Sequence, residues 1–161
     1  MEQTKAMGAK RLRAAGITGV ILSVVLLITA FIVLGRGQEA PPAAALLLLL
    51  VGCYFIYMYI IGFVHRENLE RANWLLKLAI PAYIIYAIIA FLLIIGFITM
   101  NPVDVATSDT AQNPLSILPM LLITTTPLFL YFTGASKNKK QWMMREKNIN
   151  TADVAAKREG V

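Results

Sequence analysis

Apolar positions are gathered into four long stretches. These stretches contain no Asp, Glu, Lys, Arg or His, and they are 22, 25, 26 and 27 residues long: 14–35, 40–64, 78–103 and 110–136. About 20 apolar residues in an α-helix cross a hydrocarbon core of roughly 30 Å. Strands of a β-barrel would instead alternate between apolar and polar residues. The pattern therefore predicts an all-α fold, a four-span transmembrane helical bundle.

Polar residues between the stretches set the expected boundaries. The predicted transmembrane domain covers residues 1–136, with spans at about 15–35, 42–64, 75–100 and 114–134, and a basic tail covers 137–161. The apolar part of the first span is longer than the roughly 7–15 residues of a cleaved signal segment, so we expect the span to be retained.

The loop between the second and third spans contains charges at helical spacing. Arg66 with Glu70, and Glu67 with Arg71, are four residues apart, so we expect the second span to continue as a helix into this loop. Asn73 is the predicted cap of the third span.

Basic residues predict the orientation. Of the 15 Lys and Arg residues, 14 lie in the segments 1–13, 65–77 and 137–161. Because cytoplasmic segments are enriched in Lys and Arg, both termini and the middle loop are predicted to be cytoplasmic. No organelle-type presequence is evident. We therefore expect a multi-pass protein of a bacterial or archaeal cytoplasmic membrane.

Composition excludes several classes of protein. The chain is 58% hydrophobic and 15% charged, with a net charge of +6. An average soluble domain has about 25% charged residues, so neither a soluble globular domain nor a disordered chain fits. Cys53 and His65 are the only residues of their types, which predicts no disulfide, metal or cofactor. With no Asp, Glu, Lys, Arg or His in any of the four apolar stretches, we expect no catalytic residue and no enzymatic activity.

The first span carries a stripe of small residues on one helical face: Ala15, Gly19, Ser23 and Ala30. Small residues let helices approach closely within lipid. The stripe is predicted to pack within the bundle or, alternatively, against another subunit.

Tyrosines gather in the second and third spans. Tyr54, Tyr57, Tyr83 and Tyr86, together with Tyr59, are predicted to lie in the cytoplasmic halves of adjacent helices. Buried phenols need hydrogen-bond partners, so these side chains either link the helices or form a polar pocket for a lipid, quinone or pigment headgroup.

The fourth span contains Pro127 directly after Thr124, Thr125 and Thr126. Proline removes a backbone donor, and neighbouring hydroxyls can bond to freed carbonyls. This pattern predicts a fixed kink or, alternatively, a hinge that lines a polar path.

The tail combines basic and interfacial residues: Lys137, Lys139, Lys140, Trp142, Arg145 and Lys147. Such a cluster is attracted to anionic lipids at the cytoplasmic face or docks on a protein partner. No nucleic-acid-binding motif is present, and no nucleic-acid partner is expected. Asn150 and Asp153 predict the start of a short, separate cytoplasmic C-terminal helix that ends at Gly160.

Three functional hypotheses follow. The first is a non-enzymatic accessory or scaffold subunit of a larger membrane complex, which packs through small-residue faces and docks through its tail on other membrane protein subunits. The alternative is a small homo-oligomeric transporter, pore or holin-like protein with a kinked, Thr-lined fourth span. A weaker alternative is a lipid- or quinone-binding membrane protein.

Overall fold

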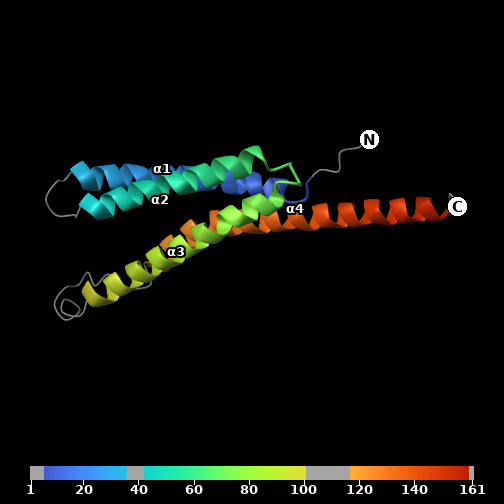
Figure 1. Cartoon of the computed structure of the whole chain (residues 1–161). Helices are drawn as coiled ribbons and strands as arrows, with labels where there is room; N and C mark the ends of the chain where they lie inside the picture. Colours follow the sequence, from blue (N-terminus) through green and yellow to red (C-terminus); the bar gives the residue numbers. More distant parts are fainter. Residues whose placement is uncertain (1–5, 36–41, 101–116, 160–161) are drawn as a thin grey trace.

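The described part of the chain folds into α-helices. A computed structural model describes residues 6–35, 42–100 and 117–159, and within these ranges it contains four α-helices and no strand. They are α1 (Ala9–Gly35), α2 (Pro42–Val64), α3 (Ala72–Met100) and α4 (Ile117–Glu159) (Figure 1). The predicted all-α architecture is confirmed for the described residues.

The helices form two antiparallel pairs, α1 with α2 and α3 with α4 (Figure 1). The pairs meet near the start of α1 and the α2–α3 turn, and they diverge away from this region (Figure 1). Direct packing between α2 and α3 is slight, whereas α1 packs extensively on α4. The contact between α1 and α4 therefore holds the two pairs together.

Three helices are long and apolar enough to cross a membrane: Ala9–Ile32, Leu46–Val64 and Ala72–Leu92. Less than a third of each is buried inside the protein. Exposed apolar surface on this scale is unfavourable in water and is accommodated by hydrocarbon. The protein is therefore a membrane-embedded helical protein. The fourth predicted span corresponds to the first half of α4, and its crossing stays a prediction, as does the side on which the termini lie.

The core lies where the two helix pairs meet. The Tyr59 ring of α2 lies against Gly19 of α1, where an added Cβ would be 2.6 Å from ring atoms. The Tyr131 ring of α4 occupies the space beside Gly62 of α2. The two tyrosine rings contact each other edge to face, with centroids 6.1 Å apart. Glycines thus make room for two large aromatic side chains that join α1, α2 and α4.

The prediction of a separate C-terminal helix that starts at Asn150 is wrong, because α4 continues without a break through this residue. Residues 137–159 belong to α4, which is 43 residues long and about 65 Å in length. Residues 135–159 contain neither Gly nor Pro, and they are rich in Ala, Lys, Arg, Glu and Met, which favour helix. The helix therefore has no local signal at which to stop.

The α2–α3 turn also differs from the expectation. Helix α2 ends at Val64, so Arg66 and Glu67 are not on a helix. The cap is Asn68 instead of Asn73, since Asn68 Oδ1 accepts hydrogen bonds from the backbone N–H groups of Glu70 (3.1 Å) and Arg71 (3.3 Å). These hydrogen bonds hold the turn that leads into α3.

Candidate functional site

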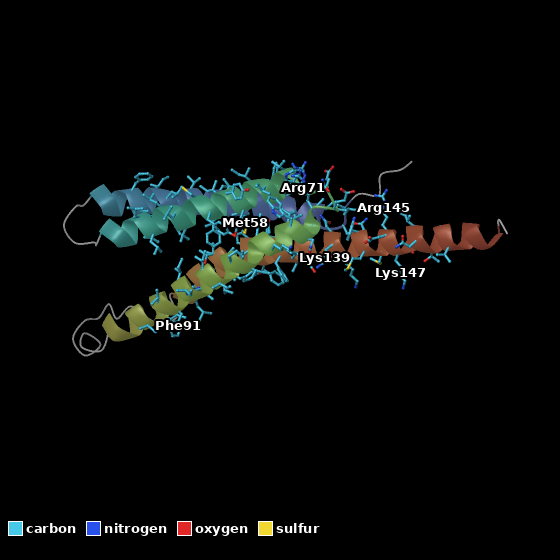
Figure 2. All side chains as sticks on the ribbon, in the orientation of Figure 1. Met58, Arg71, Phe91, Lys139, Arg145 and Lys147 are labelled. Atoms are coloured by element: carbon cyan, nitrogen blue, oxygen red, sulfur yellow. The ribbon has the colours of Figure 1, made fainter. Side chains whose placement is uncertain are left out.

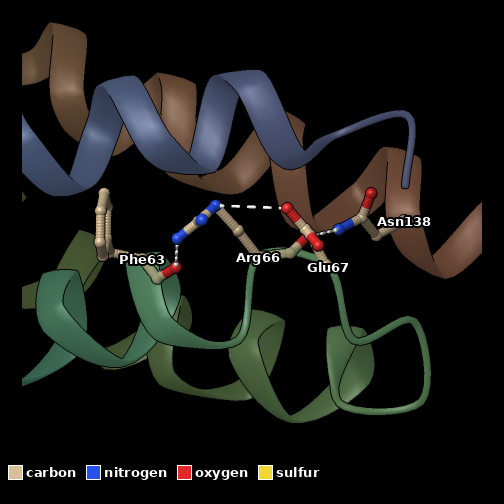
Figure 3. A network of polar contacts seen from close by, with 4 residues as sticks. All are labelled: Phe63, Arg66, Glu67 and Asn138. Carbon is tan, nitrogen blue, oxygen red and sulfur yellow. Dashed lines mark hydrogen bonds and ion pairs between the residues drawn. The ribbon is translucent and has the colours of Figure 1, made fainter. Parts of the chain in front are cut away.

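A buried amide side chain joins three parts of the chain. Asn138 of α4 is fully buried, and its Oδ1 accepts a hydrogen bond from the backbone N–H of Gly8 at 2.6 Å. Its Nδ2 donates to the carbonyl of Arg66 at 2.8 Å (Figure 3). A carboxamide carries both an acceptor and donors, so one side chain satisfies both groups. Gly8, Arg66, Asn138 and Gln141 are called the polar junction below.

The polar junction caps the start of α1. The first N–H groups of a helix have no partner within it and are usually capped by a nearby Ser, Thr, Asp or Asn. Here the caps come from α4, because the backbone N–H of Met7 donates to Gln141 Oε1 at 2.8 Å and that of Gly8 donates to Asn138. A Cβ at Gly8 would overlap the carbonyl oxygen of Gly134. Only glycine at this position permits the approach that the caps require.

The Arg66 side chain folds back on the end of α2. Its Nη1 donates to the carbonyl of Phe63 at 2.9 Å, and the guanidinium carbon lies 4.6 Å from the centre of the Phe63 ring. Arg66 Nε lies 3.7 Å from Glu67 Oε1 (Figure 3). These contacts fix the turn so that the Arg66 carbonyl faces Asn138, although an exposed ion pair of this kind adds little stability itself.

His65 has a structural partner in the same turn. Arg71 Nη1 lies 2.7 Å from His65 Nε2, and the His65 ring contacts Trp74 edge to face. Arginine only donates, so Nε2 must accept and the imidazole proton is on Nδ1. Among the residues with described positions, no three His, Cys, Asp or Glu side chains are grouped as a metal would need.

The small-residue stripe of α1 is buried within the chain. Ala15 and Ala30 are fully buried, while Gly19 and Ser23 are also buried, and Ser23 Oγ donates to the carbonyl of Gly19 at 2.8 Å. Gly19 faces Tyr59 of α2. All four stripe residues are therefore buried among the chain's own helices.

The four tyrosines of the hypothetical pocket have different surroundings. The Tyr54 hydroxyl donates to the Leu78 carbonyl at 2.6 Å, the Tyr83 ring contacts Phe132 edge to face, and Tyr57 is 51% exposed. Tyr86 instead reaches α4. The hydrogen bonds of Tyr54 and Tyr86 therefore link neighbouring helices.

Tyr86 and the threonines form a hydroxyl cluster between α3 and α4. The Tyr86 hydroxyl donates to the Leu121 carbonyl at 2.9 Å and lies 2.9 Å from the hydroxyls of both Thr124 and Thr125. Thr124 and Thr125 also donate to the Leu121 carbonyl, and Thr126 donates to that of Leu122. Tyr86, Leu121, Thr124 and Thr125 are called the hydroxyl cluster below.

Pro127 is fully buried inside α4 and leaves the Ile123 carbonyl without its usual backbone donor. The hydroxyls of Thr125 and Thr126 donate to the carbonyls of Leu121 and Leu122, so these two bonds do not reach the carbonyl that Pro127 frees. Helix α4 continues through the proline nonetheless.

The predicted basic tail lies on the second half of α4. Beyond Gln141, α4 extends past the ends of the other three helices (Figure 1). Trp142 and Lys139 are half-buried, whereas the other basic residues of the cluster are exposed: Lys137, Lys140, Arg145 and Lys147. Arg145 and Lys147 project from opposite sides of the helix (Figure 2).

The sequence-based prediction missed Gly8, Asn138, Gln141 and Tyr131. The available signal was weak: Asn138 is an amide among lysines, which is typical of an exposed tail, and Gly8 lies before the first apolar stretch.

Comparison with protein-family models, curated proteins and solved structures finds no match to this chain. The polar junction binds different parts of the same chain and fixes α4 to the bundle. Among the described residues, the buried Tyr131 hydroxyl has no hydrogen-bond partner. Several charged residues in the second half of α4 are exposed, including Arg145 and Lys147.

Proposed function

We propose that this protein is a non-enzymatic accessory or scaffold subunit of a larger membrane complex. One observation carries the proposal: α4 is fixed to the bundle by the polar junction and then continues as a free helix for about 27 Å beyond Gln141. A helix held at its base and exposed along its length suits the docking of another subunit.

The polar groups inside the helices support this proposal over a catalytic or coupled-transport role. Thr29 and Ser23 donate to carbonyls of α1, and Tyr54 donates to one of α3. Catalysis and ion coupling need titratable groups at the site, and the apolar stretches contain no acid, base or His. By its basic residues, we place the protein in a bacterial or archaeal cytoplasmic membrane with both termini inside.

Gentle extraction tests the accessory role. The tagged full-length protein is extracted from its native membrane in a mild detergent, and its particle size and co-eluting polypeptides are determined by gel filtration and mass spectrometry. We expect a particle with other polypeptides in fixed ratio. The same sample passed through a dissociating detergent is the control. Recovery of the chain only as a monomer or a homo-oligomer contradicts the proposal.

The hydroxyl cluster favours a second candidate, a homo-oligomeric transporter, pore or holin-like protein. The cluster places three half-buried hydroxyls between α3 and α4 within otherwise apolar helices. Solute or ion flux into liposomes that contain this chain alone would support it, provided that replacing Thr124 and Thr125 by Val alters the flux. Thr29→Val, on α1, is the matched control. Absence of flux rejects this candidate.

The tyrosines give less support to a lipid- or quinone-binding protein, because Tyr54 and Tyr86 already bind other helices of the chain. Native mass spectrometry for a co-purified small molecule tests this third possibility.

A further inference from the structure

The face of α4 that packs on the other helices does not end where the bundle ends. Four residues spaced three or four apart are fully buried there: Leu128, Tyr131, Ala135 and Asn138. Residues at this spacing share one helical face. The same alternation of three and four continues along the helix through Trp142, Arg145, Ile149 and Ala152, which together are called the distal face below.

The distal face is open. Trp142 is half-buried, Ile149 is 53% exposed, and Arg145 and Ala152 are exposed. This part of α4 extends past the other helices (Figure 1). Helices in proteins are stabilised mainly by packing one apolar face, and a single helix of this length is marginal in water. A face that continues an internal interface and carries Trp and Ile is therefore suited to receive another helix.

The charge of the segment selects the partner. Residues 137–147 contain five basic residues and one acidic residue, Glu146. A second copy of the chain would present the same basic segment from the same side of the membrane, and a symmetric pair would place Arg145 against Arg145. Like charges at such positions are repulsive. An acidic partner is complementary, whereas a second copy is not.

The membrane surface is also a poor occupant of the distal face. At physiological ionic strength electrostatic attraction decays over about 8 Å, which is roughly five residues of helix. Helix α4 runs uninterrupted to Glu159, and residues 135–159 contain no Gly or Pro at which it could bend onto the bilayer. With α4 crossing the bilayer as predicted, Lys137 and Lys139 lie within reach of lipid headgroups at the end of the bundle, whereas Ile149 and Ala152 lie beyond it.

We propose that the distal face binds an acidic helical segment of a partner polypeptide, with Trp142 and Ile149 in apolar contact and Arg145 paired with a carboxylate. This inference rests on the proposed accessory role and names the class of partner that the role requires. The partner recognised in this way carries Asp or Glu beside an apolar helical stripe.

A designed peptide tests this recognition with the full-length protein in phosphatidylcholine nanodiscs. The probe is a 24-residue helical peptide, about 36 Å long, with a Leu stripe flanked by Glu. Two matched peptides carry Gln or Lys in place of Glu, and binding is measured by fluorescence anisotropy. We expect the Glu peptide to bind at least tenfold more tightly than the Gln peptide, and the Lys peptide not to bind. Equal affinity for all three overturns the proposal.

Arg145 and Lys147 provide a matched pair of variants, because they project from opposite sides of α4 (Figure 2). Arg145→Glu and Lys147→Glu make the same change in charge. We expect Arg145→Glu to weaken binding of the Glu peptide at least tenfold and Lys147→Glu to weaken it less than threefold. Ile149→Asn, at unchanged charge, should weaken binding by a similar factor to Arg145→Glu. Equal losses of peptide affinity from Arg145→Glu and Lys147→Glu would show that the peptide is attracted only by the overall charge of α4. This result would overturn the proposal that the distal face is the binding surface.

Two further measurements distinguish the other occupants. Both use a fluorophore attached to Ile149→Cys in a Cys53→Ala background. Quenching of the fluorophore by nitroxide-labelled headgroups in anionic nanodiscs would show contact with lipid. Energy transfer between labelled molecules would show contact with a second copy. Either result overturns the proposal. If the peptide does not bind but the extracted complex retains its polypeptides, the docking face is wrong and the accessory role stands. If extraction yields no complex with other polypeptides, the accessory role itself is contradicted, whatever the peptide result.

Discussion

Single positions decide whether α1 and α4 can approach each other. Gly8 and Gly134 face each other, and the backbone N–H of Gly8 is bonded to Asn138. Neither glycine could be recognised from the sequence, because Gly8 lies in a polar segment and its contact is with a residue far along the chain. The stripe that ends at Ala30 was recognisable because its members recur on one face of a single helix. The periodicity of small residues along a helix predicts which face of that helix packs, but it does not predict which residues of the other helices this face contacts.

Gly8→Ala tests the close approach. The added methyl group would overlap the Gly134 carbonyl, so α1 must move and the hydrogen bonds to Asn138 and Gln141 must lengthen. We expect a loss of about 1–3 kcal/mol, as for overpacked sites, measured as denaturation of the detergent-solubilised protein by circular dichroism. Gly35→Ala is the control, since nothing lies within 4 Å of a Cβ there. Equal stability of the two variants would contradict the packing.

Asn138→Ala tests the polar junction directly. The change leaves the Gly8 N–H and the Arg66 carbonyl without their partner in a buried place. Unpaired buried polar groups cost about 1–3 kcal/mol, so we expect a loss of stability in this range. Asn148→Ala removes the same side chain from an exposed position of α4 and should change stability by less than about 0.5 kcal/mol. A neutral Asn138→Ala would show that water replaces the amide.

At the scale of helices, apolar stretches predicted α1, α2 and α3 well, and they predicted α4 poorly. Length and uniform apolarity are enough to identify a helix that crosses hydrocarbon, because lipid imposes the same demand on every residue. The second half of α4 is polar and has no such pattern, so the sequence suggested a separate helix at Asn150. The absence of Gly and Pro from residues 135–159 was the better guide to its continuity.

The hydroxyl cluster joins α3 to α4, and Tyr86→Phe tests how much it contributes to their pairing. The change removes the phenol that bonds to the Leu121 carbonyl and lies beside Thr124 and Thr125. Hydrogen bonds between membrane helices contribute about 0.6 kcal/mol on average, with a maximum of about 1.7 kcal/mol, and we expect a loss within this range in the same denaturation assay. Tyr57→Phe, at a side chain 51% exposed, is the matched control and should be neutral. A neutral Tyr86→Phe would mean that the pair is held by apolar packing alone.

At the scale of the whole molecule, the structure and the charge distribution both single out one end of the bundle. The α2–α3 turn, the start of α1 and the base of the α4 extension lie together at one end of the bundle (Figure 1). The sequence assigns 14 of the 15 basic residues to the segments 1–13, 65–77 and 137–161, which include the α2–α3 turn and both termini. Positive residues are retained on the cytoplasmic side during insertion, so this end of the bundle is predicted to be cytoplasmic. The arrangement of helix pairs around the α1–α4 contact could not be predicted, because it depends on glycines and amides that no periodicity reveals.

Labelling of single cysteines tests this orientation and the fourth crossing together. Three single-cysteine variants are made in a Cys53→Ala background: Glu67→Cys, Asn148→Cys and Asp109→Cys. Each variant is treated with a membrane-impermeant maleimide in intact cells and in inverted vesicles. We expect Glu67→Cys and Asn148→Cys to react only in inverted vesicles and Asp109→Cys only in intact cells. The residue Asp109 lies outside the described residues, so its side rests on the charge pattern alone. Because the structure places Glu67 and the base of the α4 extension at one end, different sides for Glu67→Cys and Asn148→Cys would contradict the fold. The same side for all three would instead contradict the crossing of the membrane by both α3 and α4, because α3 lies between Glu67 and Asp109. Failure of α4 alone to cross would place Asn148→Cys on the side of Asp109→Cys, opposite Glu67→Cys.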